Sequence, residues 1–184
     1  MANDVKRIEI GAATISFSAY VTAGGAGSFT DAGYTEGAAE LEPINSNYDV
    51  KPEQVLGAIM SVPIEFGVKL KFAMREAAAE QLQWVLRQPA GSLSGTGPNR
   101  TLLIGDPSET YQQMKLVTKG GRATGGGAQA AQTWTFWRCV VESVQPIGIS
   151  KDKEKIVGVT MNCLYDESVS TADKYGKVVN TGGT

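Results

Sequence analysis

The chain has 184 residues and a formal net charge of −2, with 42% hydrophobic residues, 20% charged residues and no histidine. This composition is typical of a globular protein, and no apolar run approaches the about 20 residues of a membrane helix. Because histidine is the commonest general base near neutral pH and the commonest metal ligand, its absence disfavours most acid–base and metal chemistry. The small acidic excess disfavours a nucleic-acid-binding domain, which usually carries a basic face.

The first part of the chain predicts short strands. Candidates lie at Val5–Ile10, Thr14–Val21 and Ala38–Leu41. In the second of these, Ile15 and Phe17 alternate with polar residues, and this period of two indicates a half-buried strand. One apolar and one polar face is typical of an antiparallel sheet with one side in water. The opening residues contain no apolar secretory segment, so we expect folding in a cytoplasm.

Residues 45–63 interrupt this pattern and predict a long loop without structure of its own. Such loops in compact domains are usually functional, and an exposed apolar patch needs a cover. We expect either a contact with another copy of the chain or a flap over the chain's own core. The charged and apolar residues that would make the contact are Asp49, Lys51, Glu53, Val55, Leu56, Ile59 and Met60.

A strand followed directly by a helix comes next. Ile64–Phe72 alternates strictly between apolar and other residues, which predicts a strand. Met74–Gln88 is rich in strong helix formers, carries an apolar stripe at helical spacing and ends before Pro89. We expect this helix to cover an open end or edge of the sheet.

Four further strands are expected, at Thr101–Ile104, Thr110–Thr118, Thr133–Val144 and Lys155–Tyr165. The third is apolar on both faces, which indicates cover on both sides. Residues 1–165 then form one β domain, an antiparallel β-sandwich or barrel with one α-helix. Residues 166–184 are polar and predict a C-terminal arm that orders only against a neighbour, or not at all.

Each candidate motif for catalysis or cofactor binding lacks a residue that its chemistry requires. The glycine-rich stretch 120–127 lacks the Gly-Lys-Ser/Thr ending of a phosphate-binding loop. In Gly91–Gly95, Leu93 occupies the position where a nucleophile elbow needs a serine. Cys139 and Cys163 are too few for a zinc site and are expected to be buried thiols. We therefore predict no catalytic residue, no cofactor, no metal site and no enzymatic activity.

Two segments carry a resemblance to a known family. Asp31–Gly37 precedes a short strand and a long acidic and apolar loop, and Ile64–Phe72 leads directly into the helix Met74–Gln88. In this order the elements resemble the tail tube (major tail) proteins of long-tailed bacteriophages. The resemblance extends from Val5 to Tyr165.

The resemblance implies a structural virion protein of the phage tail, assembled in the cytoplasm of the bacterial host. Six subunits would form a ring around a shared β-barrel, and stacked rings would form the tube through which DNA is ejected. About 24 strands about 4.8 Å apart would enclose a lumen on the order of 40 Å wide, which admits duplex DNA. The implied partners are the chain itself, tape measure, tail tip and tail terminator proteins, and double-stranded DNA that passes without tight binding; no membrane is involved.

Within such a tube, the residues named above in the loop 45–63 would form the contact between rings. The polar strand faces would include the lumen lining, for which the candidates are Ser16, Ser18, Glu65, Lys69, Gln112, Thr160 and Asn162.

Other functions stay open at this point. A tail completion protein or a type VI secretion tube protein would share the architecture. A non-catalytic β-sandwich that binds carbohydrate would need an exposed aromatic platform, which Trp134 and Trp137 could supply. An enzyme is the least supported, since no catalytic constellation is present.

Overall fold

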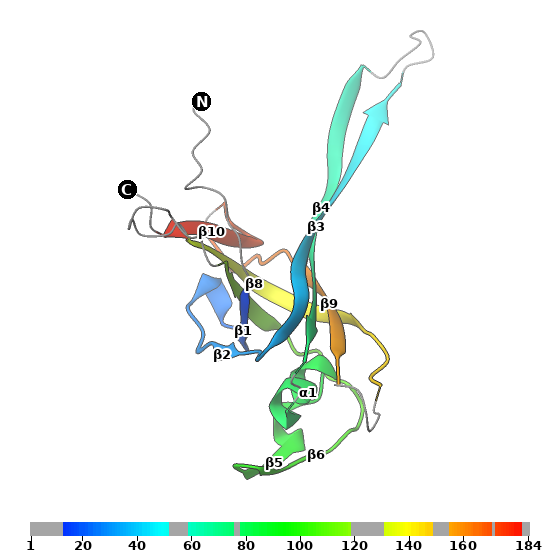
Figure 1. Cartoon of the computed structure of the whole chain (residues 1–184). Helices are drawn as coiled ribbons and strands as arrows, with labels where there is room; N and C mark the ends of the chain where they lie inside the picture. Colours follow the sequence, from blue (N-terminus) through cyan, green and yellow to red (C-terminus); the bar gives the residue numbers. More distant parts are fainter. Residues whose placement is uncertain are drawn as a thin grey trace.

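The computed structural model describes residues 13–51, 59–75, 78–118, 131–148, 155–170 and 172–181. In this part of the chain the fold is mainly β and antiparallel, with one α-helix, as predicted and consistent with a β-sandwich (Figure 1). The strands are β1 (Thr14–Ala19), β2 (Thr30–Asp31), β3 (Thr35–Val50), β4 (Met60–Met74), β5 (Leu93–Thr96), β6 (Asn99–Leu102), β7 (Gln112–Val117), β8 (Ala131–Val144), β9 (Val157–Leu164) and β10 (Gly176–Thr181). The helix is α1 (Ala79–Val85), and 3-10 turns lie at Thr22–Gly24 and Ala90–Ser92.

Eight strands form one sheet in the order β2-β1-β7-β8-β9-β4-β3, with β10 also paired to β8. One edge of β8 pairs with β7, and the other pairs first with β10 and then with β9. The predicted strands at Thr14–Val21, Ile64–Phe72, Thr110–Thr118, Thr133–Val144 and Lys155–Tyr165 are all present, with shifted ends. β5 and β6 form a separate hairpin near the predicted strand Thr101–Ile104, and Val5–Ile10 lies outside the described residues.

The core lies on one face of the large sheet, and Trp84 and Val85 of α1 are part of it. Alternation along β4 places Leu70, Phe72 and Met74 on this face, where all three are buried. Trp84 of α1 stacks on Phe17 with ring centroids 4.7 Å apart. Burial of each such side chain stabilises the fold by about 1.5–3 kcal/mol. Trp84 therefore brings α1 against the core face of the sheet, whereas the sequence predicted that the helix would cover an open end or edge.

The helix is shorter than predicted. Met74 is the last residue of β4, pairs with Val157 and is fully buried, and the described helix begins only at Ala79. The prediction failed because Met74 continues the alternating series of Leu70 and Phe72 into the core, and this burial outweighs helix propensity.

The long loop predicted at residues 45–63 is wrong for the described residues. β3 and β4 form a continuous antiparallel hairpin in which Asn45 pairs with Phe66 and Val50 pairs with Met60. Residues 43–49 are poor in strand formers, but strand preference depends mainly on the cross-strand partner, and β4 supplies Val62 and Phe66 as partners. The stretch 52–58 lies outside the described residues.

The prediction of a C-terminal arm that orders only against a neighbour, or not at all, is wrong for the described residues after 165. β10 pairs with β8 of the same chain, and Val169 is buried. Asp166 is also buried and accepts hydrogen bonds from Tyr20 and Ser168. The indole of Trp137 donates to the carbonyl of Asp173 at 2.8 Å. This contact supplies the second cover that apolar residues on both faces of β8 predicted.

Candidate assembly interface

The β3–β4 hairpin extends beyond the sheet as a two-stranded arm, residues 45–50 and 60–66. β9 pairs with β4 only as far as Val68, opposite Cys163. Beyond that point β4 pairs with β3 alone. In Figure 1 the arm projects from the end of the molecule opposite α1, β5 and β6.

The arm carries apolar side chains that the described chain leaves uncovered. Their exposed fractions are Tyr48 62%, Met60 58%, Val62 38% and Ile64 65%, and Ile59, directly before β4, is 62% exposed. Phe66, at the base of the arm, is 50% exposed and contacts the ring of Tyr175. Farther along the same strand, Leu70 is completely buried. Phe66 lies on the same side of β4 as Leu70 but beyond the end of β9, whereas Val62 and Met60 lie on the other side because of a bulge. No described element covers the apolar side chains at the end of the arm, and exposed apolar surface of this kind marks an interaction site.

A bulge gives the end of the arm one apolar face. The register shifts between Ser46 and Asn47, so that Ile64 is an extra residue in β4. Since an inserted residue reverses which side chains share a face, Val62 lies opposite Tyr48, on the side of β4 away from Phe66, and Pro63 lies opposite Asn47 on the other side. The next pair on the apolar side is Val50 with Met60, and on the polar side Asp49 with Ser61.

Among the residues predicted for the contact between rings, the arm brings together those that are described. Asp49, Ile59 and Met60 are exposed near its end, and Lys51 is exposed directly after β3. The amide of Ile59 donates to the carbonyl of Val50 at 3.0 Å, which closes the described part of the hairpin. Glu53, Val55 and Leu56 lie outside the described residues.

Both ends of the sheet present open edges among the described residues. β3 pairs only with β4, so its outer edge has no strand beside it. At the other end, β2 pairs with just Ser16 and Phe17 of β1. An open edge is a row of unpaired amides and carbonyls that can pair with another chain.

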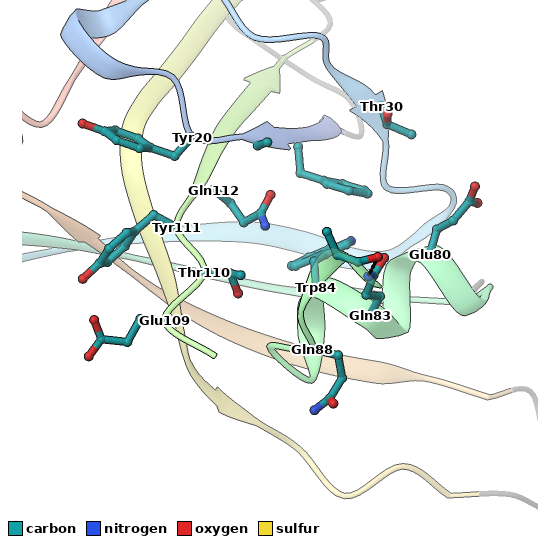
Figure 2. Close-up of a pocket in the computed structure, with 13 residues that line it drawn as sticks. Tyr20, Thr30, Glu80, Gln83, Trp84, Gln88, Glu109, Thr110, Tyr111 and Gln112 are labelled. Atoms are coloured by element: carbon teal, nitrogen blue, oxygen red, sulfur yellow. Dashed lines mark hydrogen bonds between the residues drawn. The ribbon is translucent and has the colours of Figure 1, made fainter. Parts of the chain in front are cut away.

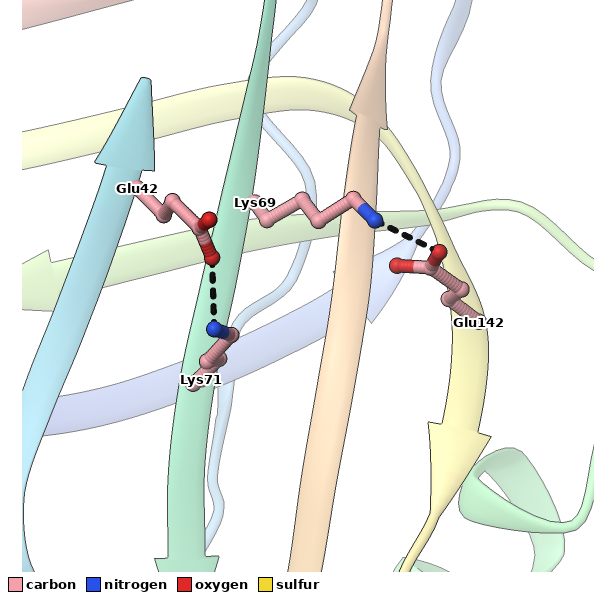
Figure 3. Close-up of polar contacts among 4 residues, drawn as sticks. All are labelled: Glu42, Lys69, Lys71 and Glu142. Carbon is pink, nitrogen blue, oxygen red and sulfur yellow. Dashed lines mark hydrogen bonds and ion pairs between the residues drawn. The ribbon is translucent and has the colours of Figure 1, made fainter. Parts of the chain in front are cut away.

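A charged face covers β4 and its neighbours on the side away from the core. Lys69 pairs with Glu142 of β8 at 2.7 Å, and Lys71 pairs with Glu42 of β3 at 2.5 Å (Figure 3). The hydrogen bond from Lys71 holds the pKa of Glu42 below its usual value, and the same bond raises the pKa of Lys71. Each lysine on this face therefore has a carboxylate partner.

The structure brings three of the predicted lumen residues together and separates the others. Lys69 lies beside Asn162, and Thr160 lies beside Lys71, so both β9 residues belong to the charged face. Ser16 lies several strands away in β1, next to Asp31 and Lys115, and Glu65 is exposed on the arm.

Two predicted lumen residues do not reach an open polar surface. Ser18 is buried, with its hydroxyl donating to the carbonyl of Ala19. Gln112 lines a cavity beside α1 on the core side of the sheet. Its position in phase with the apolar Met114 and Leu116 was the signal in the sequence that could have placed it there.

The cavity beside α1 has a volume of about 590 Å³ and lies between α1, β1 and the segment before β7 (Figure 2). Its lining is Phe17, Ala19, Tyr20, Thr30, Glu80, Gln83, Trp84, Gln88, Ala90, Glu109, Thr110, Tyr111 and Gln112. Within the described structure, Trp84 Nε1 and Thr110 Oγ1 have no hydrogen-bond partner. Sequence reasoning did not predict this cavity.

The described residues contain no cluster of three or more His, Cys, Asp or Glu side chains suited to hold a metal ion. None of the helices in the described part of the chain is long and apolar enough to cross a membrane. No protein-family model matches the sequence, and no curated protein matches it.

Proposed function

We propose that this chain is a structural subunit without catalytic activity that assembles with its own copies into stacked hexameric rings, forming a phage tail tube for DNA ejection. The observation that carries the proposal is the arm. Among the described residues nothing covers its apolar face, and no strand of that part of the chain pairs with the outer edge of β3, on which the arm is built. A protein that functions as a monomer would be expected to shield both features.

The open edges support lateral association. β3 ends the sheet on one side, and β2 covers only part of β1 on the other. If neighbouring subunits pair at these edges around a ring, closure removes the open edges at both ends of the large sheet. The six-fold count comes from the resemblance to tail tube proteins.

The two ends of the molecule support axial association. The arm occupies one end, and α1 with the β5–β6 hairpin occupies the other (Figure 1). Near β6, Leu103 and Ile104 are 64% and 74% exposed, and the aromatic cavity lies beside α1. A contact between unlike surfaces at opposite ends is heterologous and can repeat without limit, as a stack of rings requires.

The charged face supports a lumen through which DNA passes without tight binding. Contacts between lysine or arginine and phosphate dominate the non-specific affinity of proteins for DNA. Lys69 and Lys71 are each held by a carboxylate, and the chain has a net charge of −2. Such a wall is hydrophilic and attracts phosphate weakly.

One alternative function fits the structure less well, and two others predict the same structural features as a tail tube. A tail completion protein or a type VI secretion tube protein would use the same arm and edges. The carbohydrate-binding alternative needs exposed indoles, but Trp137 is 4% exposed and Trp134 is half-buried with its indole bonded to Gln132.

Sedimentation velocity of the purified full chain over rising concentration tests the proposal, with negative-stain microscopy of the heaviest fraction. We expect rings or tubes in equilibrium with monomer. A monomer that stays monodisperse at all concentrations would count against self-assembly and in favour of a binding module.

A further inference from the structure

Two free cysteines face each other at the centre of the sheet. Cys139 of β8 pairs with Cys163 of β9, and their sulfur atoms lie 3.3 Å apart. Directly opposed residues in antiparallel strands have Cα atoms about 4.5–5.5 Å apart, and a disulfide needs a Cα separation of about 4.4–6.8 Å. The backbone is therefore already placed for a bond between the two sulfur atoms.

The surroundings shield both sulfur atoms and keep the Cys139 thiol protonated. Cys139 is 0% exposed and Cys163 is 1% exposed. Burial raises the pKa of the Cys139 thiol well above its usual value, and the neighbouring Cys163 sulfur adds to the shift. Since the thiolate is the reactive form, the pair stays reduced in a reducing compartment, and only a small oxidant can reach it in the folded chain.

We propose that Cys139 and Cys163 form a cross-strand disulfide when the folded chain meets a small oxidant such as hydrogen peroxide, so that the pair acts as a redox latch across the sheet. This inference rests on the geometry of the two strands and does not depend on the proposed function. In a virion component, the change would follow release from the reducing host cytoplasm into an oxidising medium.

The chemistry balances with hydrogen peroxide as the oxidant. The peroxide O–O bond breaks as one sulfur gains an oxygen, which gives a sulfenic acid and one water. The second sulfur then attacks the sulfenic sulfur, the S–S bond forms, the S–O bond breaks, and a second water leaves with the thiol proton. Two thiols and one peroxide thus give one disulfide and two waters. A small oxidant is needed because neither sulfur is exposed.

The disulfide would stabilise the sheet at its centre. The two cysteines are 24 residues apart in sequence, and closing a loop of that length restricts the unfolded chain. For a chain of this size we expect the midpoint of thermal unfolding to rise by about 10 °C. The disulfide would link β8 to β9 covalently. β9 lies between β8 and β4, and β4 forms one strand of the arm.

The test oxidises the reduced, folded full chain with dilute hydrogen peroxide, then unfolds it, alkylates the free thiols and measures the intact mass. We expect the loss of two hydrogen atoms, no alkylation of either cysteine, one cross-linked peptide that contains both, and an unfolding midpoint that rises and returns after treatment with dithiothreitol. Cys139→Ala and Cys163→Ala are the matched controls, and neither should gain stability on oxidation.

The same peroxide treatment is applied to the urea-unfolded chain. If it links the cysteines there but leaves both open to alkylation in the folded chain, the proposal is overturned. Sulfinic acid at either position in place of the disulfide, or an unfolding midpoint that falls when the disulfide forms, would also overturn it. The wild-type chain with and without oxidant gives the answer even if an alanine variant folds poorly.

Discussion

Tyr48 and Val62 lie directly opposite each other in the arm, and the described chain covers neither side chain. They share a face because of the bulge that precedes them; without the extra residue Ile64, Tyr48 would lie opposite Pro63. An arm with one apolar and one polar face has the shape of an element that docks on another molecule.

Replacing the apolar pair, Tyr48→Ser with Val62→Ser, should abolish assembly and leave the fold intact. The control is Asn47→Ser with Asp49→Ser, which changes the same number of residues on the polar face. Because all four side chains are exposed, we expect each change to alter the free energy of unfolding by only about 0.5 kcal/mol or less. Sedimentation velocity measures assembly, and equal loss in both variants would contradict a role for the apolar face.

The paired lysines predict how the charged face behaves toward DNA. Glu42→Gln with Glu142→Gln leaves Lys71 and Lys69 without the carboxylates that now hold them. We expect tighter binding of a labelled duplex, with an affinity that falls steeply as salt rises. Asp106→Asn with Glu167→Gln, which also removes two exposed carboxylates, is the control for the change in net charge. Fluorescence anisotropy measures the affinity of each variant for the duplex. An equal gain in affinity in the test variant and the control would contradict a role for the paired lysines of the charged face.

The ion pair between Lys71 and Glu42 predicts that stability depends on pH. The pKa of Glu42 in the folded chain lies below its unfolded value because Lys71 donates a hydrogen bond to the carboxylate. The stabilisation is therefore complete above the unfolded pKa and is lost as the pH falls through the folded pKa. In an NMR titration, Lys71→Gln should raise the midpoint of Glu42 toward its usual value. An unchanged midpoint would show that the pair does not form in solution.

Met161 should contribute strongly to stability because it is completely buried in the core. We expect Met161→Ala to lower the free energy of unfolding by about 2–5 kcal/mol. Ile104→Ala is the control, since Ile104 is 74% exposed, and it should cost about 0.5 kcal/mol or less. Urea denaturation of the two variants should separate them clearly, and similar midpoints would contradict the described core.

Tyr175 should fasten the C-terminal segment to the base of the arm. Its hydroxyl donates to the carbonyl of Phe66 at 2.6 Å, and the two rings are 5.0 Å apart. Tyr175→Phe keeps the ring and removes the hydrogen bond, at an expected cost of about 0.5–1.5 kcal/mol. Tyr175→Ala should cost more, since the ring contact is also lost. Hydrogen exchange in β10 measures the loosening, and unchanged protection in both variants would contradict this role.

Alternation in the sequence predicted most of the large sheet, because side chains such as Ile15 and Leu70 repeat with the period of a strand. The prediction from alternation failed where an inserted residue changed which side chains share a face of the strand. In β8, strict alternation would place Cys139 with Trp137, but the register shift opposite Gln112 and Met114 returns Cys139 to the core with Phe136. Bulges of this kind depend on the partner strand, which a single sequence does not reveal.

The arm could not be predicted for a related reason. Residues such as Asn45 and Asp49 disfavour strands on their own, and they become strand residues because β4 lies beside them. The apolar residues Ile59 and Met60 were predicted to need a cover, either another copy of the chain or the chain's own core, and the structure leaves both exposed. The sequence thus indicated that these residues need a cover but not the shape that presents them.

The most direct measurement is a cryo-electron microscopy reconstruction of whatever the purified full chain forms. We predict a closed ring in which a strand of the neighbouring subunit pairs along the outer edge of β3 and the arm packs on the next ring. A chain that stays monomeric, or an assembly in which the β3 edge and the apolar face of the arm both remain in solvent, would contradict the proposed function.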